Sequence, residues 1–485
     1  MGTWTWLAEI PWTLLLIVEL VVIFGYVLIE RRQPSATLAW LLTIISLPVI
    51  GVVLYLVFGR TRMRRQASRR RKLRDKSVAA LGRHRYREEP LAEAEVDERT
   101  EPTVRLAVRM DAIPASRGND VRVLVNAAEA YAAMRESIDA AAQHLHLEFY
   151  IWNDDGTGRD FRDRLVAKAR AGVEVRVLVD AFGSSGLPND FFAPLLAAGG
   201  HAAQFSPLSR FRRLFKGGRV DFRNHRKLLI ADGNVGFTGG INIGDEYLGK
   251  DKTVGMWRDT HMRIEGPAVY GLQRAFLEDW CWASDEAKFE VDEYFPKLRS
   301  AAGNDVVLIV DSGPDRRWWP IYRLHVQAIA LARNRIWLTN PYFLPDRVME
   351  EALVTAALRG VDVRVLVPVK GDSRLVALAS EALFPTLIDA GIKIYRYGNG
   401  FVHAKTLLID DWLGTVGSAN LDTRSFQLNF ELNAFAFGAE LTGTLAKHFE
   451  SDVGGTQELK VADVRNVGYG TRLARQAAHL LSPLL

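Results

Sequence analysis

A histidine, a lysine two residues later and an aspartate five residues after that lysine occur together at two places in the chain. The two copies are His225, Lys227, Asp232 and His403, Lys405, Asp410. In each copy an apolar stretch separates the lysine from the aspartate, which predicts a buried strand. Side chains alternate between the two faces of a strand, so the histidine and the lysine of each copy should point to the same side.

Histidine and lysine at this spacing can transfer a phosphoryl group without a metal. A phosphodiester is an anion, and fixed cations on its non-bridging oxygens stabilise the charge that moves during an in-line displacement. Lys227 and Lys405 would supply two such cations. A neutral imidazole can attack phosphorus while an imidazolium protonates the leaving alkoxide, so the reaction needs two histidines in opposite protonation states. The two copies provide one histidine each.

Small residues and an asparagine recur behind both copies. Gly239, Gly240 and Asn242 follow the first copy, and Gly417, Ser418 and Asn420 follow the second at the same offsets. The small residues would let the backbone approach a phosphate closely, and the amides of Asn242 and Asn420 would donate to it. One copy of such a pattern arises by chance in many chains, but two copies with the same downstream residues do not.

Four acidic residues would support the histidines or the strands around them. Asp259 lies 34 residues after the first motif histidine, and Glu431 lies 28 residues after the second. A carboxylate on one imidazole nitrogen fixes the tautomer and orientation of the ring, so Asp259 and Glu431 are the matching partners. Asp232 and Asp410, at the ends of the predicted strands, are better placed to hold a turn or a neighbouring cation than to contact substrate.

The two motifs lie inside a longer internal repeat. Residues 171–179 read AGVEVRVLV, and residues 359–367 read RGVDVRVLV. In each repeat an Ala- and Leu-rich stretch precedes a glycine and then a β-branched run, which indicates alternating helix and strand. We therefore expect two pseudo-symmetric α/β halves, 106–290 and 291–485, each a mixed sheet flanked by helices. A site between them would draw one set of groups from each half.

The first 60 residues are strongly apolar. Residues 12–29 and 36–58 are each long enough to span a bilayer, and the polar segment 30–35, which contains Pro34, separates them. They predict a two-helix membrane anchor over 1–60, in which Pro48 and Gly51 would either kink the second run or make it re-entrant. A cleaved signal peptide is excluded, because no basic n-region and no small-residue cleavage site are present.

A charged linker is expected over 61–105. Its basic cluster at 60–76 places the rest of the chain in the cytoplasm by the positive-inside rule, although Arg31 and Arg32 argue mildly for the opposite orientation. The composition, 48% hydrophobic and 25% charged, excludes a disordered or collagen-like chain. The single cysteine, Cys281, excludes a disulfide framework and a thiolate metal cage. We expect neither a metal nor a cofactor.

The paired motifs resemble those of the phospholipase D superfamily, whose hallmark is two HKD motifs. Further stretches resemble bacterial cardiolipin synthases, namely residues 34–40, 222–224, 239–247, 257–259, 340–345 and 481–485. The resemblance implies a phosphatidyltransferase that joins two phosphatidylglycerol molecules into cardiolipin, with release of glycerol, through a phosphohistidine. It also implies a location in the cell (inner) membrane and anionic membrane lipid as the partner, with no nucleic acid. By analogy His225 is the nucleophile and His403 the general acid and then base, but the symmetry also allows the reverse.

Three alternatives use the same residues. A phospholipase D would pass the phosphatidyl group to water or to another alcohol. A phosphodiesterase acting on nucleic acid should show a basic aromatic groove and needs no membrane hairpin. An inactive membrane scaffold should have lost a motif histidine or lysine, and all four are present. The sequence is compatible with a homo-oligomer, and residues 472–485 would lie either in the membrane interface or on the body of the protein.

Overall fold

The computed structural model describes the chain in segments. They are residues 21, 24–25, 27–29, 34–55, 97–205, 222–250, 255–284, 291–296, 302–371 and 373–482. Those up to 55 belong to one compact unit, and those from 97 onward belong to a larger unit that contains both motifs. Most of the first apolar run and the basic cluster at 60–76 lie outside the described residues.

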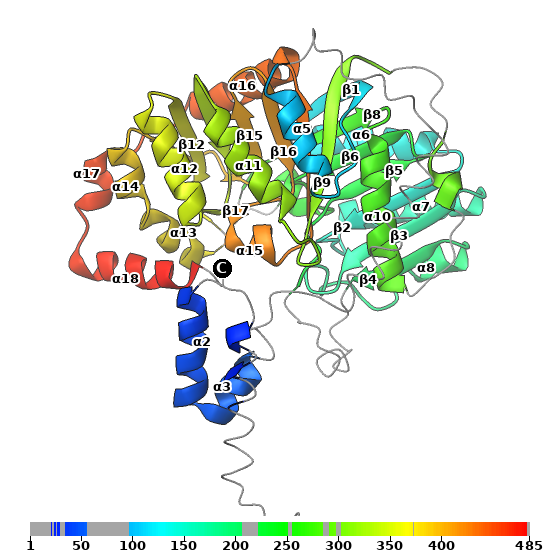
Figure 1. Ribbon diagram of the computed structural model, residues 1–485. Coiled ribbons are helices and arrows are strands. Elements are labelled where there is room, and N and C mark those ends of the chain that lie inside the picture. Colours follow the sequence, from blue (N-terminus) through cyan, green and yellow to red (C-terminus); the bar gives the residue numbers. More distant parts are fainter. Residues whose placement is uncertain are drawn as a thin grey trace, which may run out of the picture. The chain divides into compact units, whose positions relative to one another are not determined.

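In the N-terminal unit the second apolar run is broken. Helix α2 (Pro34–Ser46) ends before Leu47, and helix α3 (Pro48–Leu54) packs back against α2 (Figure 1). A residue before proline disfavours the helical conformation, and Leu47 has φ −136° and ψ 72°. A Cβ on Gly51 would lie 2.7 Å from the carbonyl oxygen of Thr43, so glycine permits this close return. None of the helices in the described residues is long and apolar enough to cross a membrane.

One mixed sheet runs through the larger unit, where the described residues form 14 paired strands (Figure 1). The strands of the first half are β1 (Ser116–Val125), β2 (His144–Phe149), β3 (Glu174–Asp180), β4 (His201–Phe205), β5 (Leu228–Ala231), β6 (Val235–Gly239) and β8 (Thr260–Glu265). Those of the second half are β9 (Asp305–Ser312), β10 (Arg335–Thr339), β12 (Asp362–Pro368), β13 (Lys393–Tyr397), β15 (Thr406–Ile409), β16 (Leu413–Gly417) and β18 (Glu431–Phe437). Helices lie on both sides of this sheet.

The strand order is the same in both halves. From one edge the sheet runs β4-β3-β2-β5-β6-β8-β1, and from the other edge it runs β13-β12-β10-β15-β16-β18-β9. Strands β1 and β9 pair in antiparallel fashion and join the halves. Parallel pairs such as β2 with β3 lie beside antiparallel pairs such as β5 with β6. The predicted α/β architecture is confirmed, and β5 and β15, which follow the two motifs, occupy equivalent positions.

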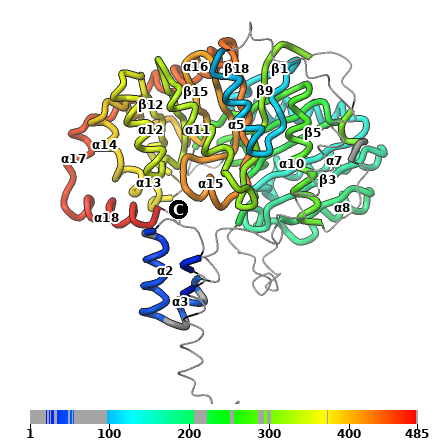
Figure 2. The backbone as a smooth tube through the Cα atoms, viewed as in Figure 1, coloured from blue at the N-terminus to red at the C-terminus, as the bar shows by residue number. Residues whose placement is uncertain are grey.

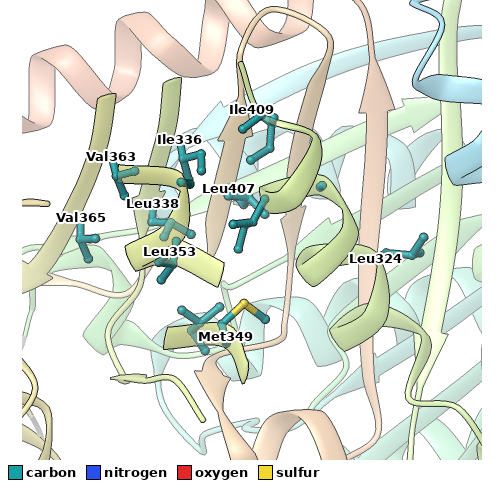
Figure 3. Close-up of a cluster of buried hydrophobic side chains, with 14 of the residues drawn as sticks. Leu324, Ile336, Leu338, Met349, Leu353, Val363, Val365, Leu407 and Ile409 are labelled. Atoms are coloured by element: carbon teal, nitrogen blue, oxygen red, sulfur yellow. The ribbon is translucent and has the colours of Figure 1, made fainter. Parts of the chain in front are cut away.

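Each half has its own hydrophobic core. In the second half, side chains of β10 and β12 such as Ile336 and Val363 belong to the same cluster as Leu353 of helix α12 (Arg347–Leu358), as Figure 3 shows. In the first half, Met134 of α6 (Asn126–Ala140) and Leu165 of α7 (Gly156–Arg170) are fully buried. Burial of one such aliphatic side chain contributes about 1.5–3 kcal/mol, so these cores fix the strands that carry the motifs.

The end of the segment expected as a charged linker is part of the folded unit. Helix α5 (Thr100–Val108) packs against helix α11 (Pro320–Leu331) of the second half (Figure 2). Its Ala107 is fully buried in the second core, and Arg99 forms an ion pair of 2.5 Å with Asp410. The chain therefore contacts its C-terminal half before it enters the first half.

The C-terminal helix packs on the body of the protein. Helix α18 (Tyr469–Leu480) lies against helix α13 (Arg374–Glu381), and the guanidinium of Arg475 bonds to Glu381. The sequence left two placements open for residues 472–485, in the membrane interface or on the body of the protein, and the described part of this stretch packs on the body. The opposite side of α18 presents Tyr469, Leu473 and Leu480 to solvent.

Candidate active site

Both motif histidines lie immediately upstream of a buried central strand. His225 and Lys227 precede β5, and His403 and Lys405 precede β15. All four side chains are buried. The pairing of β5 with β2 and β6, and of β15 with β10 and β16, fixes the two strands on both edges.

Two backbone connections between the halves bring the motifs together. Strand β14 (Phe401–Val402) pairs in parallel with β7 (Trp257–Arg258), and Asn224 forms a parallel bridge with Phe430. The backbone N–H of His403 donates to the carbonyl of Arg258 at 2.7 Å. The corresponding N–H of His225 donates to the carbonyl of Phe430 at 2.9 Å. The next residue after each acceptor is an acid, so each acid arrives beside the histidine of the other half.

The two acids are exchanged between the halves. Nδ1 of His403 lies 2.7 Å from Oδ2 of Asp259, and Nδ1 of His225 lies 3.1 Å from Oε2 of Glu431. The order along the chain had associated each acid with the histidine of its own half, and the parallel pairing above is the reason that this association is wrong. Each ionised carboxylate can only accept a hydrogen bond from its histidine, so Nδ1 of the ring carries the proton. Nε2 of the neutral imidazole can then act as nucleophile or base.

The ammonium groups of the two lysines bond to backbone carbonyls of their own motifs. Nζ of Lys227 donates to the carbonyl of His225 at 2.6 Å, and Nζ of Lys405 donates to the carbonyl of His403. Burial lowers the pKa of Lys227 to about 7, and the positive charge of Lys405 acts in the same direction. An anionic phosphate beside Lys227 would raise the pKa of this lysine, because opposite charges favour the ionised form.

Burial makes both histidines neutral in this state. It lowers the pKa of His403 to about 3, assisted by the charge of Lys405, and it also lowers the pKa of His225, against the opposing charge of Glu431. Burial alone would raise the pKa of Asp259 and of Glu431, but the histidine that each one holds lowers it. The carboxylates therefore stay ionised and ready to stabilise an imidazolium.

The motif aspartates lie at the far ends of the strands from the histidines. The carboxylate of Asp232 accepts from the backbone N–H groups of residues 142–144 at the start of β2. That of Asp410 accepts from the N–H groups of residues 333–335 at the start of β10, as well as from Arg99. Both residues adopt the left-handed conformation, with φ 52° and φ 51°. Their contacts hold turns, as expected from their positions at the strand ends.

The two asparagines are buried but differ in their contacts. Nδ2 of Asn242 donates to the hydroxyl of Tyr247 at 2.5 Å, and its Oδ1 accepts from the N–H of Ile151 at 3.0 Å. Oδ1 of Asn420 has no hydrogen-bond partner among the described residues. Phosphate binding by either asparagine stays a prediction, and Asn242 would have to give up an existing bond to take part.

Comparison with known proteins identifies the family. Residues 134–280 and 325–453 match the family model described as "Cardiolipin synthase, PLD-like domain", and residues 11–60 match the model described as "Phospholipase_D-nuclease N-terminal". The chain belongs to the cardiolipin synthase family. The resemblance found in the motifs is thereby confirmed over most of the chain.

Two family members illustrate the similarity. A cardiolipin synthase of Geobacillus sp. (strain WCH70) is 38% identical over 466 residues, which cover 96% of this chain and 92% of the relative. Cardiolipin synthase 2 of Bacillus anthracis is 40% identical over 461 residues, which cover 95% and 88%. The crystal structure of a phosphatidylserine synthase of Haemophilus influenzae Rd KW20 aligns with a TM-score of 0.61 at 15% identity, covering 79% of this chain and all of that one. That likeness establishes a shared fold.

Aromatic side chains to which the sequence analysis assigned no role surround the histidines of this cardiolipin synthase family member. The ring of Tyr150 lies 4.8 Å from that of His225. Around His403, the rings of Trp257 and Phe401 lie at 5.1 Å and 5.7 Å. Only the fold shows that Tyr150, at the end of β2, comes close to His225.

A network of buried charges surrounds Arg226 of the first motif. Arg226 pairs with Asp279 at 2.5 Å and with Asp311 at 3.3 Å, and Asp311 also pairs with Arg274 at 3.0 Å. The corresponding residue in the second motif is Ala404. The two halves of the site therefore share the residues suited to phosphoryl transfer, but they differ in the residue between the histidine and the lysine and in the contacts that it makes.

Proposed function

We propose that the chain is a cardiolipin synthase that transfers a phosphatidyl group from one phosphatidylglycerol to a second one and releases glycerol. The observation that carries this proposal is the reciprocal arrangement of the site. One histidine from each half has Nδ1 held by a carboxylate of the other half, and a buried lysine lies two residues after each histidine. This arrangement offers two imidazole groups and two cations for one phosphodiester.

The reaction would run in two displacements at phosphorus. In the first, Nε2 of one histidine forms a bond to phosphorus, the bond to the glycerol oxygen breaks, and the other histidine gives its proton to that oxygen. In the second, the now neutral histidine takes the proton from a hydroxyl of the second phosphatidylglycerol. That oxygen bonds to phosphorus, and the phosphorus–nitrogen bond breaks to restore the free imidazole. Lys227 and Lys405 would stabilise the charge on the non-bridging oxygens throughout.

Within this scheme we assign His225 as the nucleophile and His403 as the general acid and then base. The assignment follows the resemblance to the family, and the pseudo-symmetry makes the reverse assignment its direct competitor. Both histidines are neutral in the free site, so the acid must gain its proton as the anionic substrate enters.

We further propose that the protein acts at the cell (inner) membrane, with 1–60 as a two-helix anchor, the segment between residue 61 and helix α5 as a connection, and the two catalytic halves in the cytoplasm. The match of residues 11–60 to the N-terminal family model supports an anchor, as do the two apolar runs. The basic cluster supports the orientation. Membrane fractionation and labelling of cysteines introduced at 61–105 and 30–35 would test it, and labelling of 61–105 from the outside would overturn it.

The activity test uses purified protein and labelled phosphatidylglycerol in mixed micelles with a metal chelator. Cardiolipin and glycerol in equal amounts, both lost in His225→Ala, are the expected products. Phosphatidic acid without cardiolipin would instead indicate a hydrolytic phospholipase D. No turnover by the wild type would return the nucleic acid phosphodiesterase and the inactive scaffold to consideration.

A further inference from the structure

We propose that Arg223 binds the phosphate of the acceptor lipid, in a second anion site beside the one that holds the transferred phosphate. This inference rests on the proposed function. A phosphatidylglycerol acceptor differs from water or glycerol because it carries its own negative charge. Two phosphates in one buried site repel each other, so a cation beyond those assigned to the transferred phosphate would favour this acceptor.

Alternation of side chains places Arg223 on the catalytic face of its segment. Asn224 and Arg226 both contact Asp279, at 3.2 Å and 2.5 Å, and so point into the buried network. His225 and Lys227 point the other way, since both lie against the ring of Tyr150, at 4.8 Å and 5.4 Å from its centre. Arg223 is two residues before His225, a step of about 6.6 Å along an extended chain, and shares its face.

The guanidinium of Arg223 lies near the Asp180 carboxylate, whose pKa its positive charge acts to lower, but the described residues show no ion pair between the two. The central carbon of the guanidinium lies 4.9 Å from the centre of the Phe182 ring, and Arg223 is only 8% exposed. Nη1 is buried without a hydrogen-bond partner among the described residues. The nearby carboxylate of Asp180 is occupied, because it accepts from the N–H groups of Phe182, Gly183 and Asn224. A buried cation with an unused donor is costly unless an anion completes it.

The opposite half has no equivalent cation. Phe401 stands two residues before His403, where Arg223 stands before His225. Arg424 of the second half also lies near Tyr150, because its charge, like that of Arg223, acts to lower the pKa of Tyr150, which burial raises to about 12. The second anion site is therefore built on the His225 side alone.

The spacing suits a glycerol bridge. In the product, three carbons and two ester oxygens separate the two phosphorus atoms. This span is comparable to the distance of about 6.6 Å between alternate residues of an extended strand. His225, which would carry the transferred phosphate, and Arg223, beside the acceptor phosphate, are one such step apart and would match the two charges of the product.

The test compares two acceptors for the same phosphatidyl-enzyme. In micelles of phosphatidylglycerol with labelled glycerol, cardiolipin reports transfer to a charged acceptor, and label in phosphatidylglycerol reports transfer to a neutral one. In Arg223→Gln we expect the ratio of cardiolipin formation to glycerol exchange to fall about tenfold or more, because one charge-assisted contact is lost. The matched control is Arg162→Gln. Arg162 lies on the outer helix α7, with its guanidinium 4.8 Å from the ring of Phe191, and its replacement should not change the ratio of the two reactions.

The outcomes separate this inference from the proposed function. An unchanged ratio in Arg223→Gln, or an equal fall of both reactions, would overturn the acceptor site while cardiolipin synthesis stands. A wild type that exchanges glycerol but forms no cardiolipin would overturn the proposed function and this site with it.

A second measurement, on the wild type, tests the site if the Arg223→Gln variant does not fold. Glycerophosphoglycerol, which has the acceptor phosphate without acyl chains, should be used at least tenfold better than glycerol, and equal use would refute the site.

Discussion

Asp259 belongs to the first half of the chain, yet its Oδ2 lies 2.7 Å from Nδ1 of His403 in the second half. Glu431 and His225 form the reciprocal pair. Each imidazole is therefore aimed by a carboxylate that arrives from the other half on a parallel backbone pairing.

Asp259→Asn should lower turnover by about 10²–10⁴-fold, because asparagine keeps the shape of the side chain but not the charge that stabilises an imidazolium. The limb of the pH–rate profile that reports the protonated histidine should also move to lower pH. Steady-state cardiolipin formation from pH 5 to pH 9 would show both effects. Asp139→Asn, at an exposed ion pair with Arg164, is the control and should leave the profile unchanged.

The roles of the two histidines can be separated with an activated leaving group. A phosphatidyl ester of p-nitrophenol needs no general acid, so the variant that keeps the nucleophile should still release p-nitrophenol in a single burst. With His225 as the nucleophile, His403→Ala gives the burst and a stable phosphohistidine at His225, detected by mass spectrometry, while His225→Ala gives neither. The opposite pattern would reverse the assignment.

Substrate binding should be coupled to proton uptake. Burial lowers the pKa of Lys227 to about 7 in the free site, and an anion beside it should raise that pKa. Between pH 7 and pH 8.5, binding of a non-reactive phosphatidylglycerol analogue should take up as much as about one proton, measured by calorimetry in buffers of different ionisation enthalpy. Lys227→Met should remove most of this uptake. Uptake that is the same in the variant would assign the proton to another group.

The motif aspartates should matter for stability. Asp410 accepts from three consecutive backbone N–H groups and from Arg99, so Asp410→Ala should cost about 2–4 kcal/mol of unfolding free energy. The fraction that remains folded should keep its pH–rate profile. Denaturant unfolding followed by a profile at a permissive temperature tests both statements. A changed profile with unchanged stability would instead give Asp410 a part in the chemistry.

Acid should destabilise the protein through its buried histidines. Burial lowers the pKa of His325 to about 4, whereas it is about 6.5 in an unfolded chain. Above pH 6.5 both states are neutral and the shift has no effect. Between pH 6.5 and pH 4 the unfolded state binds a proton that the folded state does not, which costs about 1.4 kcal/mol per pH unit. His325→Leu should reduce the slope of unfolding free energy against pH by this amount, and an unchanged slope would show that His325 titrates normally.

The sequence was sufficient for features that are local or repeated. Two motifs of the same spacing inside a repeat predicted two α/β halves and placed His225 and His403 beside buried strands. The match of residues 171–179 with 359–367 corresponds to β3 and β12, which occupy equivalent positions in the sheet. These predictions rest on periodicity and duplication, which a chain carries along its length.

The remaining features depend on which segments meet in space. Spacing could not tell that Asp259 serves His403, because the connection runs through the pairing of β7 with β14 across the halves. Likewise, the sequence could not show that Nη1 of Arg223 lacks an acceptor, because this depends on the backbone N–H groups that bond to the Asp180 carboxylate in the fold. In the second apolar run, hydropathy indicated one long span, and the restriction that Pro48 places on Leu47 divides it.

The exchange of carboxylates has a consequence for ancestry. A half of this chain made alone would hold a histidine with no acid to orient it, and two identical halves would complete each other only as a twofold dimer. Fusion of two copies into one polypeptide removes the requirement that they be identical. Arg226 opposite Ala404, and Arg223 opposite Phe401, are positions at which the copies have since diverged. The chain thus keeps the symmetry of a dimer in its paired histidines and lysines and departs from it at Arg223, the residue proposed to bind the acceptor lipid.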